Sequence, residues 1–368
     1  MKPTIQNIFS DMHSFKKIDP FHLNKKQNKV VHDILTCRTK EKGYHTDECE
    51  NCHDISIFYN SCKNPCCPQC QAVNKEVWAM KQEFYKLNIH YFHIVFTIPS
   101  ELNSLCLLRP TLMYNILFES ASQTLKQLSE DEKYLGAQIG FTGVLHTWGA
   151  NLSLHPHIHF IVSGGGVGKD GNWISSTKKF FLPVKVVSSL FRGKFMSKLK
   201  DRFSPTWLSD PQEFFQLVDQ CYSKEWNVYT KKTMDDPSTV IHYLSRYTHR
   251  IAISNARIVS YENHEVTFRY KDYKDHSKIK YMTLSEDEFF RRYMMHVPPE
   301  RFMRIRHYGF LSNSHKTDRF IKLRAITNTP IPKEKVFKPD IITAISRIIK
   351  RDASICSCCG QRRHPLRN

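Results

Sequence analysis

The sequence predicts an α+β protein with a mainly antiparallel sheet and helices on one face. Strand-like segments cover residues 90–99, 138–148 and 155–166, and a stretch with helical periodicity covers residues 108–130. The resulting order is strand, helix, strand, strand. Two consecutive strands joined by a short connection pair in antiparallel fashion, and the helix then covers one face of their sheet. These segments are therefore expected to form a two-layer core.

Each predicted element has its own signal. The segment 90–99 (HYFHIVFTIP) is rich in β-branched and aromatic residues and ends at Pro99, whereas 155–166 ends in three glycines. Helical spacing of apolar residues predicts helices over 72–87, 181–203, 238–250 and 284–295, the last beginning with a capping pattern at Ser285. The segments AISNARIVSY and EVTFRYKDY are expected to form a hairpin that turns around Glu262–His264.

The charge balance points to a polyanionic partner. The chain has 54 Lys and Arg against 35 Asp and Glu, a formal net charge of +19. An excess of this size favours nucleic acid, because basic side chains neutralise phosphates. No segment has the apolar length of a signal peptide or a bilayer span. We therefore expect a cytoplasmic protein without a membrane partner, in which cysteines stay reduced and bind metals.

The cysteines are clustered, as in zinc-binding proteins. Seven of the twelve lie between Cys37 and Cys70. Two CxxC pairs with fourteen residues between them have nearly the zinc-ribbon spacing and predict a structural zinc site: Cys49, Cys52, Cys67 and Cys70. Either a second zinc site or a group of buried thiols is left over: Cys37, His45, Cys62 and Cys66. Near the other end of the chain, Cys356, Cys358 and Cys359 form half a site whose partners the sequence does not identify.

A histidine constellation predicts a second kind of metal site. His157 and His159 alternate in a predicted strand and therefore share one face. His146 lies eleven residues before His157, so a hairpin turning through Gly149–Leu154 would bring it opposite this pair. Three imidazoles on one face can bind a divalent cation, although histidines satisfied within a half-buried strand would give the same pattern.

A tyrosine pair and several basic side chains complete the candidate site. Tyr243 and Tyr247 are one turn apart on a predicted helix that also carries Arg246 and Arg250. They are either phenolic nucleophiles beside phosphate-binding arginines or core tyrosines of an amphipathic helix. Two basic, aromatic stretches suit contacts with single-stranded nucleic acid and contribute four further candidates: Arg269, Lys271, Arg304 and Arg306.

These motifs resemble the rolling-circle insertion-sequence transposases of the two-tyrosine HUH class (the IS91 type). The matching phrases occur in one order over roughly residues 30 to 320, among them NPCCPQCQ, HPHIHFIVSGGG and YLSRYTHRIAISNARI. The resemblance implies an HUH-like antiparallel sheet preceded by a zinc-ribbon-like module. The domains would be a zinc-binding module over 1–80, a catalytic domain over 81–325 and a basic, cysteine-containing tail over 326–368. Cys66 departs from the family pattern, in which we expect histidine.

The resemblance also implies a mechanism. His146, His157 and His159 would hold Mg²⁺ or Mn²⁺, and Tyr243 or Tyr247 would attack single-stranded DNA, leaving a 5′-phosphotyrosine and a free 3′-OH. The partners would be single-stranded transposon ends and target DNA, which places the protein at the nucleoid; the oligomeric state stays open. A plasmid replication initiator or relaxase would share this chemistry. Two further functions fit the same motifs: a non-catalytic zinc-ribbon DNA-binding regulator, and a metal hydrolase that activates water.

Overall fold

A single antiparallel sheet forms the centre of the molecule. The computed structural model describes residues 2–176, 182–232, 251–273, 275–312, 316–334 and 336–362. Within these ranges, every strand pairing of the main sheet is antiparallel. The strand order is β11 (Ile305–Gly309), β4 (Gln138–Trp148), β5 (Leu154–Val167), β3 (Tyr91–Thr97) and β7 (Val228–Lys232), and β6 (Trp173–Ser175) pairs with β5. The predicted α+β class with an antiparallel sheet is confirmed.

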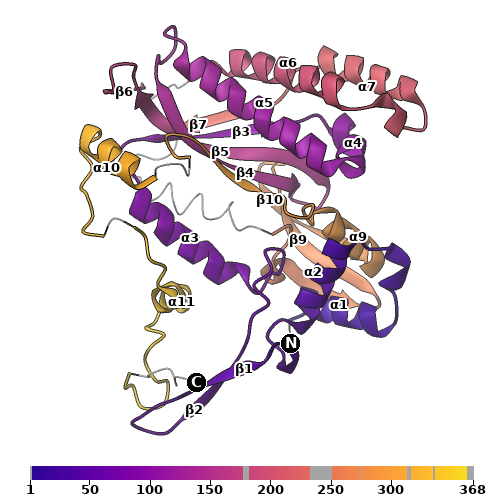
Figure 1. Cartoon of the computed structure of the whole chain (residues 1–368). Coiled ribbons are helices and arrows are strands. Elements are labelled where there is room, and N and C mark those ends of the chain that lie inside the picture. The colour runs from indigo at the N-terminus through magenta and orange to yellow at the C-terminus, as the bar shows by residue number, and fades with distance from the viewer. Residues whose placement is uncertain are drawn as a thin grey trace.

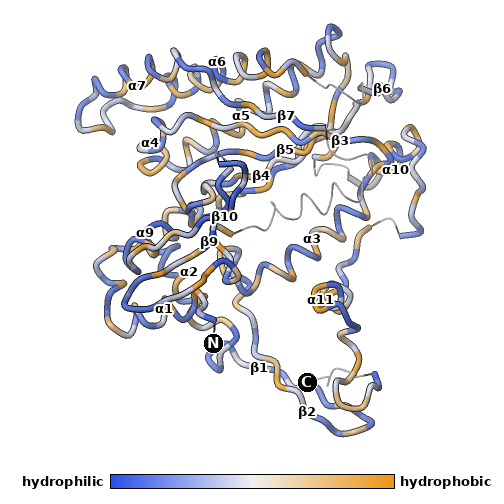
Figure 2. The backbone as a smooth tube through the Cα atoms, turned by 180° about the vertical axis from the view of Figure 1, so that it is seen from behind, coloured by the Kyte–Doolittle hydropathy of each residue, from blue (hydrophilic) through white to orange (hydrophobic). Residues whose placement is uncertain are grey.

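Helices cover one face of this sheet. The helices above it in Figure 1 are α4 (Asn103–Leu108), α5 (Pro110–Glu130), α6 (Val184–Arg202) and α7 (Pro211–Ser223). Phe96 and Phe160 point from the strands into the layer between, where their rings meet at 5.6 Å and Phe96 also contacts Phe191 of α6. Phe160 packs across Gly143, where a Cβ atom would lie 2.4 Å from its ring. Figure 2 shows the hydrophobic residues along these central strands.

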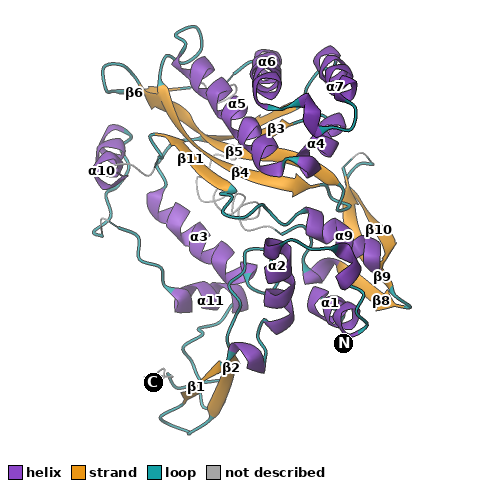
Figure 3. Cartoon of the chain, turned by 45° about the vertical axis from the view of Figure 1, so that its right-hand side comes forward, coloured by secondary structure: helices purple, strands orange, loops and turns teal. Residues whose placement is uncertain are grey.

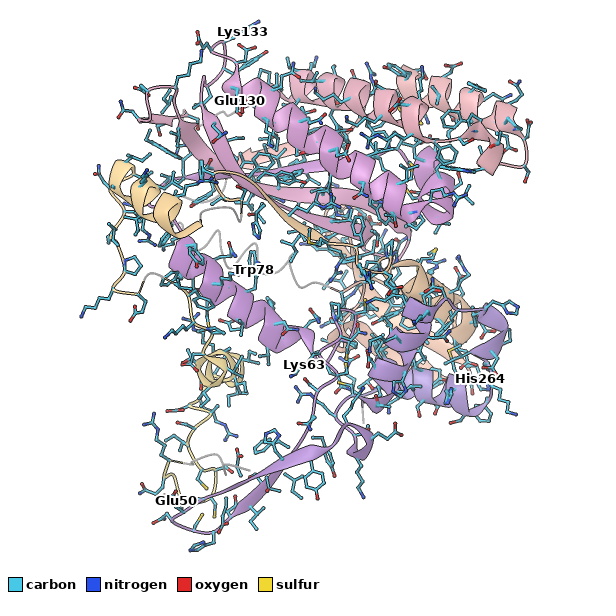
Figure 4. The ribbon with its side chains drawn as sticks, in the orientation of Figure 1. Glu50, Lys63, Trp78, Glu130, Lys133 and His264 are labelled. Carbon is cyan, nitrogen blue, oxygen red and sulfur yellow. The ribbon has the colours of Figure 1, made fainter. Side chains whose placement is uncertain are left out.

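The opposite face of the sheet is covered only in part by described residues. Helix α3 (Gln71–Tyr85) crosses beneath it, and Trp78 packs against Ile161 of β5 (Figure 4). Ile161 lies on the same face as His157 and His159, because alternate strand residues share a face. The apolar contact of α3 therefore lies beside the histidines and leaves their end of β5 to a different neighbour.

That neighbour is a second, smaller α+β layer. It contains β8 (Ile258–Glu262), β9 (Glu265–Asp272) and β10 (Lys278–Ser285), with α9 (Glu286–Met295), α1 (Ile5–Ser14) and α2 (Lys25–Thr36) packed against them (Figure 3). Phe9 of α1 meets Phe290 of α9 at 5.0 Å. The first two helices thus share a core with residues far along the chain, so the boundary expected near residue 80 does not separate two cores.

The remaining elements extend from this body. The hairpin of β1 (Tyr44–Glu48) and β2 (Ile55–Tyr59) projects at the foot of the molecule near α11 (Ile341–Ile349), while α10 (Lys316–Ile326) lies at the edge of the main sheet (Figure 1). Short 3-10 turns occur at Asp19–Phe21, Lys40–Lys42, Ser100–Leu102, Pro205–Trp207 and Asn255–Arg257. None of the helices in the described ranges is both long and apolar enough to cross a membrane.

Most predicted segments form the expected elements. The strands predicted over 90–99, 138–148 and 155–166 are β3, β4 and β5, and the Ser285 side chain accepts a hydrogen bond from the Glu288 N–H at the start of α9, as the capping pattern predicts. The segment 252–257 was expected to be a strand, but it ends in a 3-10 turn, and β8 begins at Ile258. The predicted helix over 238–250 lies outside the described residues.

The buried carboxylate of Glu286 joins several segments of the second layer through hydrogen bonds. Glu286 is 3% exposed and accepts hydrogen bonds from Lys17 and from the Tyr261 hydroxyl (2.6 Å), with His264 Nδ1 at 3.1 Å. Burial alone would raise the pKa of this carboxyl, but the hydrogen bonds from Lys17, Tyr261 and His264 leave it below its ordinary 4.5. The carboxylate therefore contributes stability above about pH 4.5 that is lost as the pH falls through the lowered folded-state pKa.

We expect Glu286→Gln to lower the free energy of unfolding by about 2 kcal/mol at neutral pH, because an amide cannot accept the charge-assisted hydrogen bonds. Urea unfolding at pH 7 and pH 4 measures this. The difference from the unchanged protein should shrink at pH 4. The matched control is Glu265→Gln, an exposed neighbour that should leave stability within about 0.5 kcal/mol. Equal losses in the two variants would contradict this role of Glu286.

Candidate functional site

The pairing of β4 with β5 brings three histidines together. His146 lies directly opposite His157 in the register, and Val144 lies opposite His159. Cross-strand partners project from the same face, so all three imidazoles point away from the helix layer. Their candidate ligand atoms lie within 4.8 Å of one another. His146 and His159 are buried and His157 is half-buried, so the group is sunk into the sheet and open on one side.

The hydrogen bonds of His157 and His159 direct their Nε2 atoms toward each other. His157 Nδ1 lies 2.6 Å from the carbonyl oxygen of His155, and because a carbonyl only accepts, this nitrogen carries the proton. The Nε2 of a neutral His157 therefore presents a lone pair. It lies 3.1 Å from His159 Nε2. Two imidazole nitrogens at this separation, with His146 beside them, form a donor set that suits a divalent cation.

A fourth histidine, His93, contacts the group through His159. His93 of β3 lies 2.9 Å from His159 Nδ1 through its Nε2, and the two rings are stacked with centroids 5.1 Å apart. Burial, with Lys231 acting in the same direction, lowers the pKa of His93 to about 4, so the ring is neutral. A hydrogen bond at Nδ1 fixes the orientation of a ligating imidazole. Sequence reasoning missed His93, because a single histidine in an apolar strand gives no signal of its own.

The tip of the β4–β5 hairpin, next to the histidines, is hydrogen-bonded to the second layer. Three successive carbonyls of the turn accept side-chain hydrogen bonds: Ala150 from Arg257, Asn151 from Arg292 (3.3 Å), and Leu152 from His296 (3.1 Å). Burial lowers the pKa of His296 to about 4, so this ring is a neutral donor. The contacts connect the hairpin tip to α9 and to the 3-10 turn before β8, and so link the second layer to the end of the sheet that carries the imidazoles.

A cavity of about 800 Å³ lies between the two layers. One wall holds His146, His157 and His159, and the other holds residues of β9. On that strand Val266 and Phe268 are buried, while Arg269 and Lys271 line the cavity, as does Tyr273 directly after the strand. Two predicted DNA contacts therefore lie opposite the histidines, next to an exposed aromatic ring that suits base stacking.

Arg306 lies away from the histidine cavity. In the register of β11 with β4, Arg306 lies opposite Gly143, which puts its side chain on the helix-covered face. Its guanidinium donates to Asn115 Oδ1 of α5 at 2.6 Å and lies 4.2 Å from the centre of the Phe118 ring. Arg306 thus anchors β11 to α5 and does not face the cavity. Arg304 is half-buried beside Cys66 and Trp148, where burial lowers the pKa of its guanidinium.

The tyrosine pair lies outside the described residues. Tyr243 and Tyr247, with Arg246 and Arg250, belong to the segment 233–250 that connects β7 to the second layer. The described residues on both sides of this segment lie near the histidines: Tyr229 of β7 lines the histidine cavity, and Ile251 borders a smaller cavity beside Trp148.

The cysteines form two groups of four, and neither is the predicted one. Cys67 and Cys70 lie with Cys37 and Cys62, whereas Cys49 and Cys52 lie with Cys356 and Cys359. The predicted set failed because Cys49 and Cys52 occupy the tip of the β1–β2 hairpin, whose strands of five residues carry them roughly 17 Å from its base. Spacing along the chain does not record this separation.

The first group, Cys37, Cys62, Cys67 and Cys70, joins helices α2 and α3. Cys37 ends α2 and Cys70 precedes α3, and both Cys37 Sγ and Cys62 Sγ lie 3.5 Å from Cys70 Sγ. A tetrahedral zinc site with Zn–S bonds of about 2.3 Å has sulfur–sulfur separations of about 3.8 Å, so these thiols fit zinc.

Two residues of the second predicted ligand set lie outside both groups. His45 is exposed, stacks on Phe58 and approaches Asn60 Oδ1 (3.4 Å). Cys66 is buried against the core, its N–H bonded to Asn64 Oδ1.

Comparisons with known proteins match this organisation. A family model described as "Putative transposase" matches residues 140–319, and one described as "Transposase zinc-binding domain" matches residues 8–98. The "Putative transposase y4qJ" of Sinorhizobium fredii is 36% identical, with 98% of this chain and 93% of the relative covered. The "Transposase for insertion sequence element IS801" of Pseudomonas savastanoi pv. phaseolicola is 27% identical over 90% of this chain and 82% of its own length. No solved structure matches.

Two neighbouring cysteines should respond differently to substitution. We expect Cys67→Ser/Cys70→Ser to lose the zinc that the first group binds and to unfold at a lower temperature, because the metal links the end of α2 to the start of α3. Cys66→Ser, the matched control, should keep the zinc. Metal analysis of the purified variants and thermal melts measure both effects. Zinc loss from Cys66→Ser alone would contradict the ligand set.

Proposed function

The chain belongs to the transposase family of the IS91 type, and from this premise we propose that it nicks and rejoins single-stranded DNA through a tyrosine nucleophile. The observation that carries the proposal is the group of His146, His157 and His159 at the wall of a cavity with a basic opposite side. The group suits a divalent cation, and the cavity suits a phosphate backbone.

The three histidines would hold Mg²⁺ or Mn²⁺. A cation bound there supplies Lewis-acid charge that withdraws electron density from the scissile phosphate. His93 supports this arrangement, since its hydrogen bond to His159 Nδ1 leaves His159 Nε2 to face the cavity. The buried surroundings of His146 and His159 strengthen the interaction of the site with a negatively charged substrate.

Tyr243 or Tyr247 would provide the nucleophile. The phenol oxygen forms a bond to phosphorus, and the bond between phosphorus and the 3′ oxygen breaks. The phenol gives up its proton and the leaving 3′ oxygen takes one up, which leaves a 5′-phosphotyrosine and a free 3′-OH. The phosphodiester energy is kept in the new bond, so rejoining needs no nucleotide triphosphate. Support comes from the residues on both sides of segment 233–250, which border the histidine cavity or the small cavity beside Trp148.

The exposed face of β9 would bind the DNA strand. Arg269 and Lys271 offer positive charge opposite the histidines, and Tyr273 is 69% exposed, with Lys271 Nζ 5.6 Å from the centre of its ring. Basic side chains that alternate with exposed aromatic rings favour a single strand, whose bases are free to stack. This face would therefore favour single-stranded ends and target.

A covalent adduct assay tests the chemistry. Incubated with labelled single-stranded element ends and Mn²⁺, the protein should give a labelled band that survives denaturation. Tyr243→Phe/Tyr247→Phe should abolish this band, because it removes both nucleophilic oxygens. His157→Ala/His159→Ala should reduce it at least 100-fold, because two imidazole ligands are lost.

The control for this assay is Tyr229→Phe, since Tyr229 lines the cavity but lies outside the pair. Its adduct should persist. Two outcomes contradict the proposal: an adduct that depends on Tyr229 and survives in the double phenylalanine variant, or cleavage that yields a free 5′-phosphate without an adduct.

The salt dependence of binding tests the β9 face. We expect Arg269→Ala/Lys271→Ala to weaken single-strand binding and to reduce the slope of log K against log salt concentration by about 1.4, because each lost phosphate contact on a single strand contributes about 0.7. Fluorescence anisotropy with a labelled oligonucleotide measures both quantities. Lys133→Ala/Lys169→Ala removes equal charge from exposed positions that do not line the cavity, and its slope should stay unchanged. Equal slopes in both variants would remove β9 from the interface.

A further inference from the structure

The second cysteine group joins two segments that are far apart in the sequence. Cys49 and Cys52 lie at the tip of the β1–β2 hairpin, and Cys356 and Cys359 lie in the C-terminal segment. Cys49 Sγ is 3.5 Å from Cys359 Sγ, and Cys52 Sγ is 3.7 Å from Cys356 Sγ. Figure 4 shows Glu50, between the two hairpin cysteines, beside the C-terminal segment at the foot of the molecule.

The two segments present their thiols on matching backbone turns. In the hairpin, the His53 N–H donates to the Cys49 carbonyl (2.8 Å) and the Cys49 N–H to the Asp54 carbonyl (3.1 Å). In the C-terminal segment, the Gly360 N–H donates to the Cys356 carbonyl (3.1 Å) and the Cys356 N–H to the Gln361 carbonyl (2.7 Å). The two turns therefore match. The first hydrogen bond of each turn joins residues four apart in the chain, and the second joins residues five apart.

The backbone conformation after each CxxC pair matches as well. His53 has φ +55° and Gly360 has φ +75°, both in the left-handed region that L side chains rarely adopt. His53 adopts it although it carries a side chain. Such a turn directs two thiols of a CxxC pair to one side, and two of them facing each other offer four thiols in a tetrahedral arrangement.

The described residues beyond α11 bury little apolar surface. Helix α11 is tied to α3 by Arg347, an exposed residue that pairs with the half-buried Glu76 and Glu83. Beyond α11, Cys356 is buried among the described residues while Ile355 is 41% exposed. A segment with so small an apolar core depends on another source of stability, and metal coordination supplies it in short cysteine modules.

We propose that Cys49, Cys52, Cys356 and Cys359 bind a second zinc ion, which fastens the C-terminal segment to the N-terminal hairpin. The sulfur separations of 3.5 and 3.7 Å are close to the edge of a zinc tetrathiolate, about 3.8 Å. Each thiol releases its proton as it binds. The site is split, since each half provides two ligands and neither is complete alone. It is independent of the DNA chemistry proposed above.

Zinc released by a mercurial reagent tests this site. p-Hydroxymercuribenzoate displaces zinc from thiolates and leaves imidazole-bound metal in place, so the histidine site does not contribute. The full-length protein should release about two equivalents per chain, and Cys356→Ser/Cys359→Ser about one. Cys358→Ser is the matched control, because Cys358 is exposed between these ligands and lies outside the group. It should release about two.

A comparison of the two halves shows whether one ion is shared. Cys49→Ser/Cys52→Ser should lose the same single equivalent, and the variant that combines all four substitutions should lose no more. Limited proteolysis should cleave the C-terminal segment faster in all three variants, because either half alone leaves it unfastened.

Several results would overturn the proposal. One is the release of only about one equivalent of zinc from the unchanged protein. This includes the case in which the four thiols form disulfides and bind zinc only after reduction. Another is undiminished release from Cys356→Ser/Cys359→Ser. Additive losses in the combined variant would mean separate sites. Complete zinc loss from the C-terminal variant would also contradict the proposal, because the Cys37 group takes no ligand from that segment.

Discussion

The antiparallel register of β4 and β5 is the constraint on which the rest of the site depends. It puts His146 opposite His157 and directs both, with His159, to the face without the phenylalanine core. A shift of β5 by one residue would exchange its two faces, burying His157 and His159 against Phe96 and the helices and moving Phe160 out of the core. The apolar residues that pack under α5 and α6 therefore also fix the orientation of the histidines.

The second layer forms the opposite wall of the cavity that the histidines line. Arg257, Arg292 and His296 bind consecutive carbonyls at the tip of the β4–β5 hairpin, so the second layer meets the main sheet at the end where the histidines lie. As a result, one strand face with metal-binding capacity lies opposite another with positive charge. The N-terminal helices contribute indirectly, because they complete the core beneath β8–β10.

The local sequence patterns predicted individual strands and helices, but they did not predict contacts between residues far apart in the chain. The periodicities identified β3, β4, β5 and α5, and the spacing of the histidines was sufficient to expect their convergence. The grouping of the cysteines was not predictable, because Cys49 and Cys52 meet residues some three hundred positions later. The position of Arg306 on the helix-covered face was not predictable, because strand β11 was not predicted. The contact of His93 with His159 was recognised only from the pairing of β3 with β5.

Anomalous diffraction at the manganese edge from crystals of the full-length protein grown with Mn²⁺ tests the central claim most directly. The account predicts one peak within bonding distance of His146, His157 and His159, on the cavity side of the sheet. A strong peak elsewhere, with the three imidazoles bonded only to each other and to His93, would contradict it.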